Sequence, residues 1–321
     1  MEWYKKKEWH EFAGAVLAAV LIYRISPVFF LFMMPLVWVF FNRGETWFVY
    51  TGALSIAGIF LLSIVLIKGV PGNVKMLLIV LEMSLPTAVF LGVWVLLHDF
   101  HMPKINASLI GITGIGILSI PLIIVLHQSV VLQDFFKTQL HDILSGAFGG
   151  ELLSEYGLSQ KGLYDFAIDM LGKNYLASLY MIITASYYLS VKLYKRIKRR
   201  ELVTLRSFTF DDRFIWFFII GWFGAILSSY KEIGVASYLF WNTAMLFLYL
   251  YGIRGIAIIE DLYEKYSVSK GARLAITIGC IIGLLTPGLN MLIAFGVPVF
   301  GASEIWIHYR ERRKGHEGHI E

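Results

Sequence analysis

Long apolar stretches separated by short polar ones dominate the chain. Ten such stretches lie at residues 12–23, 28–41, 46–67, 75–98, 105–127, 174–193, 213–229, 235–253, 272–286 and 288–307. A helix that spans a bilayer needs about 20 predominantly apolar residues, and most of these stretches come close to that length. The pattern therefore predicts an all-α fold, a polytopic transmembrane helical bundle of about eight to ten membrane segments.

The first two and the last two stretches are short or interrupted. Pro27 and Pro35 favour a break within residues 12–41, because proline removes a backbone donor from a helix. The Thr-Pro-Gly run at 286–288 favours a break within residues 272–307. Each pair is either one kinked helix or two short helices. Broken helices inside a membrane are tolerated where protein or a water-filled cavity satisfies the freed backbone groups.

Residues 128–173 form one long polar insertion in what is otherwise a single membrane domain over residues 1–321. Gln133–Leu144 and Leu163–Leu171 within it have the apolar spacing of amphipathic helices. They are either a pair of helices lying on the membrane surface or a lid over a substrate cavity. We expect the insertion to be extracytoplasmic and the polar tail, residues 308–321, to be cytoplasmic.

Composition supports a membrane environment. Hydrophobic residues make up 57% of the chain and charged residues 16%, whereas soluble domains carry about 25% charged residues. The mean hydropathy is +0.67. The net charge of +5 does not indicate nucleic acid, because the basic residues cluster at the edges of apolar runs. The lipid bilayer is therefore the expected partner of the apolar faces.

Lysine and arginine concentrate in two places, and such residues favour the cytoplasmic side. The two clusters are Lys192, Lys195, Arg196, Lys198, Arg199, Arg200 and Arg206, and Arg310, Arg312, Arg313 and Lys314 in the tail. We therefore expect a multi-pass protein of the cytoplasmic membrane with its C-terminus inside. Lys5–Lys7 before the first stretch resemble a signal peptide, but no cleavage context follows Tyr23, so we expect an uncleaved first segment.

Several catalytic chemistries lack the residues they need. One cysteine, Cys280, excludes an internal disulfide framework and a cysteine-based zinc cluster. No phosphate-binding loop and no zincin motif occur. Two histidine groups could converge on the cytoplasmic side: His98, Asp99 and His101, and His316 with His319. A metal site needs three or four converging ligands, and we predict no metal, no cofactor and no enzymatic activity.

The C-terminal third carries family-like motifs. These are Phe208–Trp216 before one apolar stretch, Asn242 within the next, Leu250–Ile258, and the closing Gly301–Arg312. They resemble the YybS-like family of predicted bacterial membrane proteins of unknown function. That family shows a Gly-Leu-Leu-Asp-like turn where this chain has Gly-Ala-Ser-Glu at 301–304. The order of segments, the long loop and the basic block fit the family over most of the chain.

The YybS-like family is itself similar in fold to the substrate-binding subunits of energy-coupling-factor vitamin transporters. Those subunits are helical bundles that capture a small molecule and are driven by a separate ATPase module. Their first helix carries small residues four apart, and here Gly14 with Ala18 and Ala15 with Ala19 have that spacing. Such a stripe lets another helix approach closely. The resemblance thus implies a docking surface for a coupling module, over part of this longer chain.

Glu82 is the first candidate site residue, because it lies well inside an apolar stretch. A charge there costs roughly 2.5–3.5 kcal/mol on insertion scales. Pro86, four residues on, removes the backbone donor to the Glu82 carbonyl. Either Glu82 belongs to a ligand or proton site, or it forms an internal salt bridge.

Three further residues complete the predicted ligand site. Asn242 either bonds a neighbouring helix or contacts a ligand. Arg254 either anchors its helix at the interface, where it could pair with the Glu-Asp sequence at 260–261, or meets a ligand. Asn290 follows a helix break that could hold an ion. Arg24 and Glu304 are further candidates for the same site.

The sequence as a whole predicts a transport-related membrane subunit that binds a small solute between helices. A separate partner would supply energy, since the chain has no nucleotide-binding motif. The alternative is a non-transporting scaffold or assembly factor for partner proteins. Fold alone does not decide between them. A polar cavity lined by Glu82 or Asn242 would favour transport, and a filled bundle would favour the scaffold.

Overall fold

The structure is a computed structural model. It describes residues 2–25, 29–67, 72–98, 109–118, 124, 128–148, 160–198, 208, 210–231 and 233–309. Within these ranges the secondary structure is helical and no strand occurs. Each of the ten predicted apolar stretches coincides wholly or partly with a helix, so the predicted all-α fold is confirmed.

Six helices in the described residues are long and apolar enough to cross a membrane. Their spans are Glu45–Leu66, Val74–Leu97, Lys161–Tyr194, Asp212–Tyr230, Val235–Lys265 and Leu289–Ile307. Two shorter apolar helices are Phe29–Arg43 and Leu109–Leu118. In five of these spans less than 40% of the apolar window is buried by the chain itself, as expected for helices that face lipid, while 56% of the window of Val235–Lys265 is buried.

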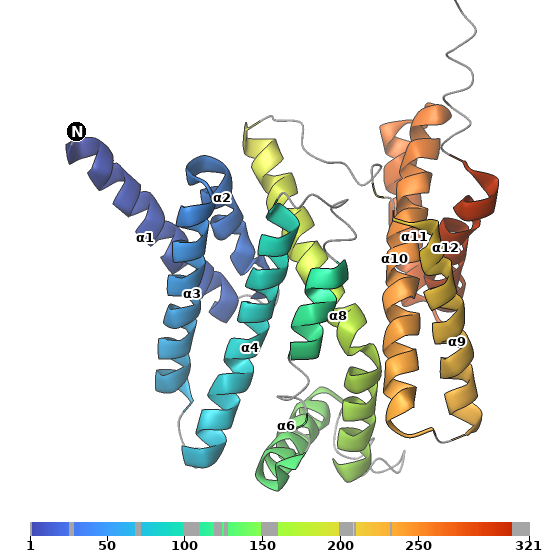
Figure 1. The fold of residues 1–321 in the computed structure, drawn as a ribbon, viewed down its shortest axis with the longest axis horizontal. Helices are drawn as coiled ribbons and strands as arrows, with labels where there is room; N and C mark the ends of the chain where they lie inside the picture. Colours follow the sequence, from blue (N-terminus) through green and yellow to red (C-terminus); the bar gives the residue numbers. More distant parts are fainter. Residues whose placement is uncertain are drawn as a thin grey trace, which may run out of the picture. The chain divides into compact units, whose positions relative to one another are not determined.

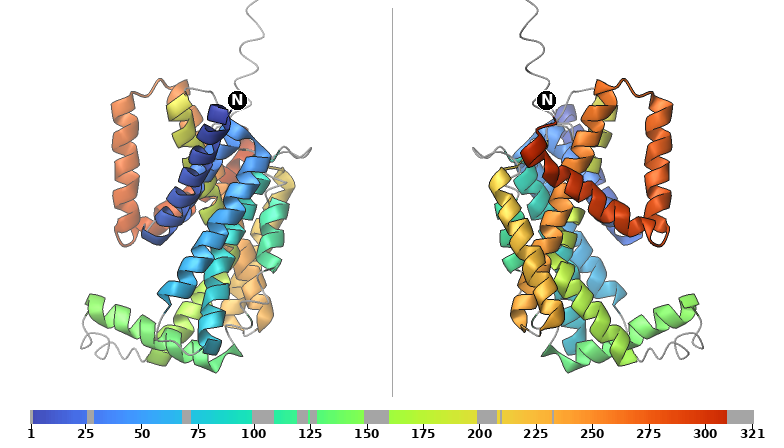
Figure 2. Two further views of the ribbon diagram at one scale, coloured as in Figure 1. Left: turned by 90° about the vertical axis from the view of Figure 1, so that its left-hand side faces the viewer. Right: turned by 90° about the vertical axis from the view of Figure 1, so that its right-hand side faces the viewer.

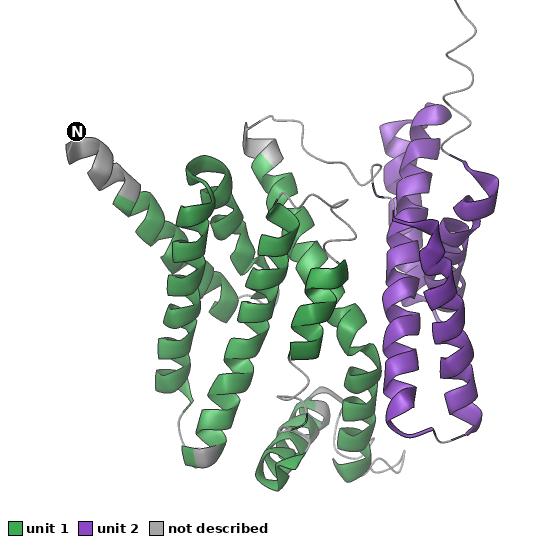
Figure 3. Ribbon diagram, in the orientation of Figure 1, with its two compact units in different colours: residues 1–201 green, residues 202–321 purple. Residues whose placement is uncertain are grey.

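The chain divides into two compact units, shown in Figure 3. Unit 1, residues 1–201, contains α1 (Glu2–Ile25), η1 (Phe29–Phe32), α2 (Met33–Arg43), α3 (Glu45–Leu66), α4 (Gly72–Leu97), the helix Leu109–Leu118, α6 (Val130–Phe148) and α8 (Gln160–Lys198). Unit 2, residues 202–321, contains η3 (Asp212–Phe214), α9 (Ile215–Tyr230), α10 (Val235–Lys265), α11 (Lys270–Leu285) and α12 (Leu289–Ile307). One membrane domain over 1–321 stays a prediction, and each unit is described by itself.

The two ambiguous pairs of stretches are each two helices. In unit 1, α1 is separate from η1 and α2, with residues 26–28 outside the described part. In unit 2, α11 ends at Leu285 and α12 starts at Leu289. Gly288 lies between them with φ +87°, a backbone conformation that favours glycine. The Thr-Pro-Gly run therefore reverses the chain, and Figure 2 shows α11 and α12 diverging from this turn.

The long polar insertion contributes one separate helix. α6 lies crosswise to the long helices at the end of unit 1 where α8 begins (Figure 2). The second predicted stretch, Leu163–Leu171, is not a helix of its own but the first part of α8. With 39 residues, α8 is about 58 Å long, whereas the hydrocarbon core is about 30 Å thick. The polar beginning of α8 therefore extends beyond the hydrocarbon.

Unit 1 has two distinct ends (Figure 1). Arg43 ends α2, Glu45 begins α3 and Leu97 ends α4, all at the end where α8 also finishes. α6 lies at the opposite end. The buried core between these ends is built from apolar side chains of α1, η1, α2, α3, α4 and α8: Ala19, Phe32, Met33, Leu36, Phe48, Ile59, Val89, Val93 and Ile183.

In unit 2, α10 packs against both α9 and α12. A Cβ on Gly301 of α12 would lie 2.0 Å from the Tyr251 carbonyl oxygen, and one on Gly255 of α10 would lie 2.2 Å from the Val297 carbonyl oxygen. Only glycine fits at such distances, so the backbones of α10 and α12 touch where they cross.

Candidate functional site

Glu82 forms an ion pair inside unit 1. The guanidinium of Arg24, at the end of α1, donates to Glu82 Oε1 on α4 and to the Ser63 hydroxyl on α3. Arg24 Nη2 also donates to the Ile59 carbonyl, at 3.1 Å. The charge in the apolar stretch is thus compensated by a cation from another helix, which is the usual arrangement within membranes. Of the two roles predicted for Glu82, the internal salt bridge is the one present in the structure.

α4 continues through Pro86, but the backbone hydrogen bond that Pro86 removes is replaced by a side chain. Because Pro86 has no N–H, the carbonyl of Glu82 lacks its usual helical donor. The Tyr23 hydroxyl of α1 donates to that carbonyl at 3.2 Å. Tyr23 and Arg24 thus both bind the Glu82 segment, one through the backbone and one through the side chain. The sequence indicated the freed carbonyl but gave no signal for Tyr23.

A groove of about 480 Å³ runs along another part of α4. It is lined by residues of α3, α4 and the helix Leu109–Leu118: Phe60, Met76, Ile79, Val80, Met83, Ser84, Thr87, Ala88, Leu91, Ile115 and Leu118. Two hydroxyls, of Ser84 and Thr87, are its polar groups, and each donates to a carbonyl of its own helix. Glu82, on the same helix, does not line it, so this groove is not the polar cavity expected of a solute site at Glu82. Ligand sites are typically 300–1,000 Å³ and mostly apolar, so the groove has suitable size and chemistry.

Arg254 is the centre of a second charged cluster, in unit 2. Its Nε donates to Glu304 Oε2 at 2.8 Å and its Nη1 to Asp212 Oδ1 at 2.9 Å. The guanidinium also lies 5.4 Å from the centroid of the Phe210 ring. Arg254 and Glu304 are buried, while Asp212 is half exposed. The cluster therefore connects η3, α10 and α12 through one cation.

The local pairing suggested for Arg254, with residues 260–261, is not what the structure shows. Its carboxylate partners lie 42 and 50 residues away in the sequence. Glu304 was noted as a candidate, but Asp212 was not singled out. The acidic pair Asp211–Asp212 just before an apolar stretch was the available signal. Asp211 caps the start of η3, because its side chain accepts a hydrogen bond from the backbone N–H of Arg213.

Each of the two predicted asparagines bonds to the backbone of its own helix or of the adjoining turn. Asn242 Nδ2 donates to the Tyr238 carbonyl one turn back in α10, at 2.8 Å, and its side chain is buried. Asn290 is exposed, and its Oδ1 accepts from the backbone N–H groups of Gly288 and Met291 at 3.1 and 2.8 Å. Asn290 thus stabilises the start of α12. Glu82 lies in unit 1, whereas Asn242, Arg254 and Asn290 lie in unit 2 with different partners. Their joint role in a ligand site stays a prediction.

The predicted docking stripe on α1 divides into two faces. Ala15 and Ala19 are buried and pack inside unit 1. Gly14 is exposed, with no atom within 4 Å of the position of a Cβ, and Ala18 is intermediate. Gly14 and Ala18 therefore make up the part of the stripe that another helix could reach.

The histidine groups are only partly described. His98 Nδ1 lies 3.2 Å from Glu45 Oε1, at the end of α4. Asp99, His101, His316 and His319 lie outside the described residues. Within the residues that the structure describes, no three His, Cys, Asp or Glu side chains gather so as to hold a metal ion.

The comparisons with known proteins give a family. The family described as "Predicted membrane protein (DUF2232)" matches residues 13–298, which is most of the chain and covers most of each unit. No curated protein and no solved structure matches this sequence. The match agrees with the expectation of a membrane protein family of unknown function.

Proposed function

We propose that this chain, which belongs to the DUF2232 family of predicted membrane proteins, is a transport-related subunit that binds a small apolar solute. The groove along α4 is the observation that carries the proposal. It is large enough for a small molecule, and its lining is apolar except for two hydroxyls. A solute that enters from lipid would meet the groove without crossing a charged surface.

The proposed solute is apolar because none of the described residues that line the groove is charged. Arg24 and Glu82 neutralise each other and do not line the groove. A charged solute would have to lose its hydration in the groove without a counter-ion, which is costly. The Ser84 and Thr87 hydroxyls can still accept a hydrogen bond from a solute, since each uses only its donor within α4.

A separate partner would supply the energy for transport. The sequence lacks a phosphate-binding loop. Gly14 and Ala18 on the outer face of α1 offer a small-residue surface for a partner helix. The likeness in fold to substrate-binding subunits of energy-coupling-factor transporters is part of this proposal.

The test is to purify the protein in mild detergent and to identify bound small molecules by mass spectrometry of its extract. We expect a defined apolar compound, and we expect Thr87→Trp to reduce its amount because indole fills the groove. Val65→Trp, on an exposed part of α3, is the matched control and should keep the compound. Thermal unfolding of both variants shows whether each is folded. Ser84→Phe is a second groove variant if Thr87→Trp does not fold.

An extract without any enriched compound, together with no copurifying ATPase, would contradict the proposal. Equal retention by Thr87→Trp and wild type would place the compound outside the groove and would also count against it.

A scaffold is the second candidate function. It is favoured by the engagement of Glu82 and Arg254 in ion pairs that join helices. These charges stabilise the bundle and are not presented to a solute. A scaffold would copurify with partner proteins at fixed stoichiometry, and Thr87→Trp would leave that stoichiometry unchanged. The transport subunit would lose its solute in the same variant.

A further inference from the structure

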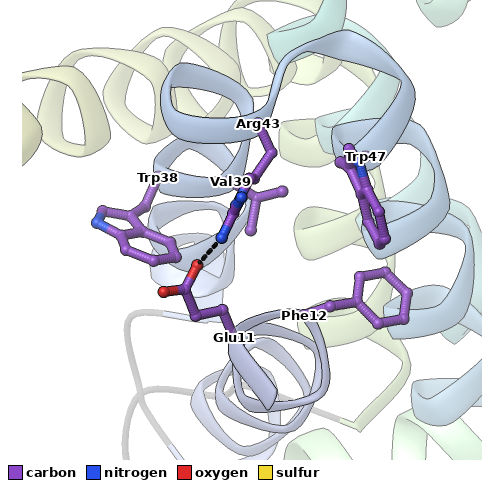
Figure 4. Close-up of a pocket in the computed structure, with 6 residues that line it drawn as sticks. All are labelled: Glu11, Phe12, Trp38, Val39, Arg43 and Trp47. Carbon is purple, nitrogen blue, oxygen red and sulfur yellow. Dashed lines mark hydrogen bonds and ion pairs between the residues drawn. The ribbon is translucent and has the colours of Figure 1, made fainter. Parts of the chain in front are cut away.

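A small, partly open cavity lies at the end of unit 1 where α2 and α3 meet (Figure 4). It is lined by Glu11 and Phe12 of α1, Trp38, Val39 and Arg43 of α2, and Trp47 of α3. Its volume is about 10 Å³, which corresponds to one water-sized group. Three of the six lining residues are aromatic and two are charged, an unusual combination for a packing defect.

The charged residues form an ion pair beside the rings. Arg43 Nη2 donates to Glu11 Oε2 at 2.8 Å, and both side chains remain about a quarter to a third exposed. Figure 4 shows Trp38 on one side of this pair and Phe12 with Trp47 on the other. The Phe12 and Trp47 rings are edge to face, with centroids 5.5 Å apart. Trp9 packs against both, at 5.7 and 6.1 Å.

The limits of the candidate spans would put the cavity at the level of lipid headgroups. The membrane-crossing span of α3 begins at Glu45, two residues after Arg43. At the same end, Glu45 Oε1 accepts a hydrogen bond from Trp94 Nε1 of α4 at 2.8 Å. Tryptophan is enriched at the membrane–water interface. An anion and a cation held side by side at this depth face the zwitterionic surface of the bilayer.

We propose that this cavity binds the headgroup of a phospholipid with a primary ammonium group, of the phosphatidylethanolamine class. The ammonium would occupy the cavity against the Glu11 carboxylate, among aromatic faces that attract cations. The phosphate would lie on Arg43, because guanidinium groups bind phosphate well. The two opposite charges of the headgroup thus match the two opposite charges of the protein. This inference does not depend on the proposed solute-binding function.

Size makes the proposal specific. An ammonium group is close to a water molecule in size and fits a cavity of about 10 Å³. The trimethylammonium group of phosphatidylcholine is several times larger and does not fit. Phosphatidylglycerol has no cation to oppose Glu11. The structure therefore assigns a preference for the ethanolamine headgroup over both others.

The experiment is native mass spectrometry of the full chain, released from detergent with equal concentrations of the three lipids carrying identical acyl chains. We expect phosphatidylethanolamine to be retained about tenfold more strongly than the other two, corresponding to one desolvated cation contact. Glu11→Gln should remove this preference. Asp169→Asn, which breaks an ion pair on α8 away from the cavity, is the matched control and should keep it.

Trp47→Leu is a second variant that removes an aromatic wall and keeps both charges. It should weaken retention of phosphatidylethanolamine if Glu11→Gln does not fold. Equal retention of all three lipids by the wild type would overturn the proposal and leave a water-filled cavity. Stronger retention of phosphatidylglycerol would also overturn it, since binding would then depend on Arg43 alone. A preference that survives Glu11→Gln and Trp47→Leu would place the lipid elsewhere.

Discussion

Arg254 shows how one side chain can hold three elements of unit 2. Its guanidinium binds Glu304 of α12 and Asp212 of η3 from a position that is almost fully buried. Removing one member of a buried ion pair is more costly than removing a surface pair, because the remaining charge keeps its desolvation penalty. The geometry depends on the planar fork of arginine, which a lysine does not reproduce.

We predict that Arg254→Gln lowers the free energy of unfolding by about 3–5 kcal/mol. The reason is that Glu304 and Asp212 lose the cation they share. Equilibrium unfolding of the detergent-solubilised protein, followed by tryptophan fluorescence, measures the change. The control is Arg213→Gln, whose side chain is 92% exposed, and which should change stability by less than about 1 kcal/mol. Equal effects of the two substitutions would refute a structural role for the cluster.

Individual charged residues could be recognised from the sequence, whereas their partners could not. Glu82 and Arg254 are recognisable because a charge in an apolar stretch must be compensated. Their partners, Arg24 for Glu82 and Asp212 for Arg254, lie 58 and 42 residues away in the sequence. Helical periodicity relates residues three or four positions apart, so it cannot identify such contacts.

At the scale of elements, the crossing of α10 and α12 is the tightest contact that unit 2 offers for a test. Gly301 lies against the backbone of α10, with no room for a methyl group. Gly296, on the same helix, has open space around it. A comparison of alanine substitutions at Gly301 and Gly296 separates the effect of crowding from the general preference of helices for alanine over glycine.

We expect Gly301→Ala to destabilise the protein by about 1–3 kcal/mol, as is typical of overpacking. Gly296→Ala should leave stability unchanged or raise it slightly, because alanine favours the helix. Differential scanning fluorimetry of the two purified variants is sufficient to compare them. If Gly301→Ala melts no lower than Gly296→Ala, the close crossing of the two helices is not present in the protein.

Helix positions were easier to predict from the sequence than helix connections. Apolar stretches located α3, α4 and α10 because each is long and continuous. The continuity of α8 was missed, since its first two turns are polar and read as part of the loop. A helix can continue from the hydrocarbon into water. Its backbone hydrogen bonds stay the same there, while its side chains become polar because they now face water.

At the scale of the whole molecule, the two ends of unit 1 allow a prediction of its orientation in the membrane. The basic end of α8 lies with the start of α3, and α6 lies at the opposite end (Figure 1). Lysine and arginine favour the cytoplasmic side, so the start of α3 should be cytoplasmic and α6 extracytoplasmic. This orientation rests on the same lysines and arginines as the expectation from the sequence, and it stays a prediction.

Cysteine labelling in cells tests this orientation. Cys280 is the one cysteine of the chain, so Cys280→Ser gives a background without thiols. In that background, Asp142→Cys on exposed α6 should react with a membrane-impermeant maleimide in intact cells, because this end faces outward. Thr46→Cys, at the exposed start of α3, should react only after the membrane is permeabilised. Labelling of Thr46→Cys alone would mean an inverted protein. Labelling of both from outside would mean that the ends of unit 1 do not lie on opposite sides of the bilayer, and the spanning arrangement of α3 and α4 would be wrong.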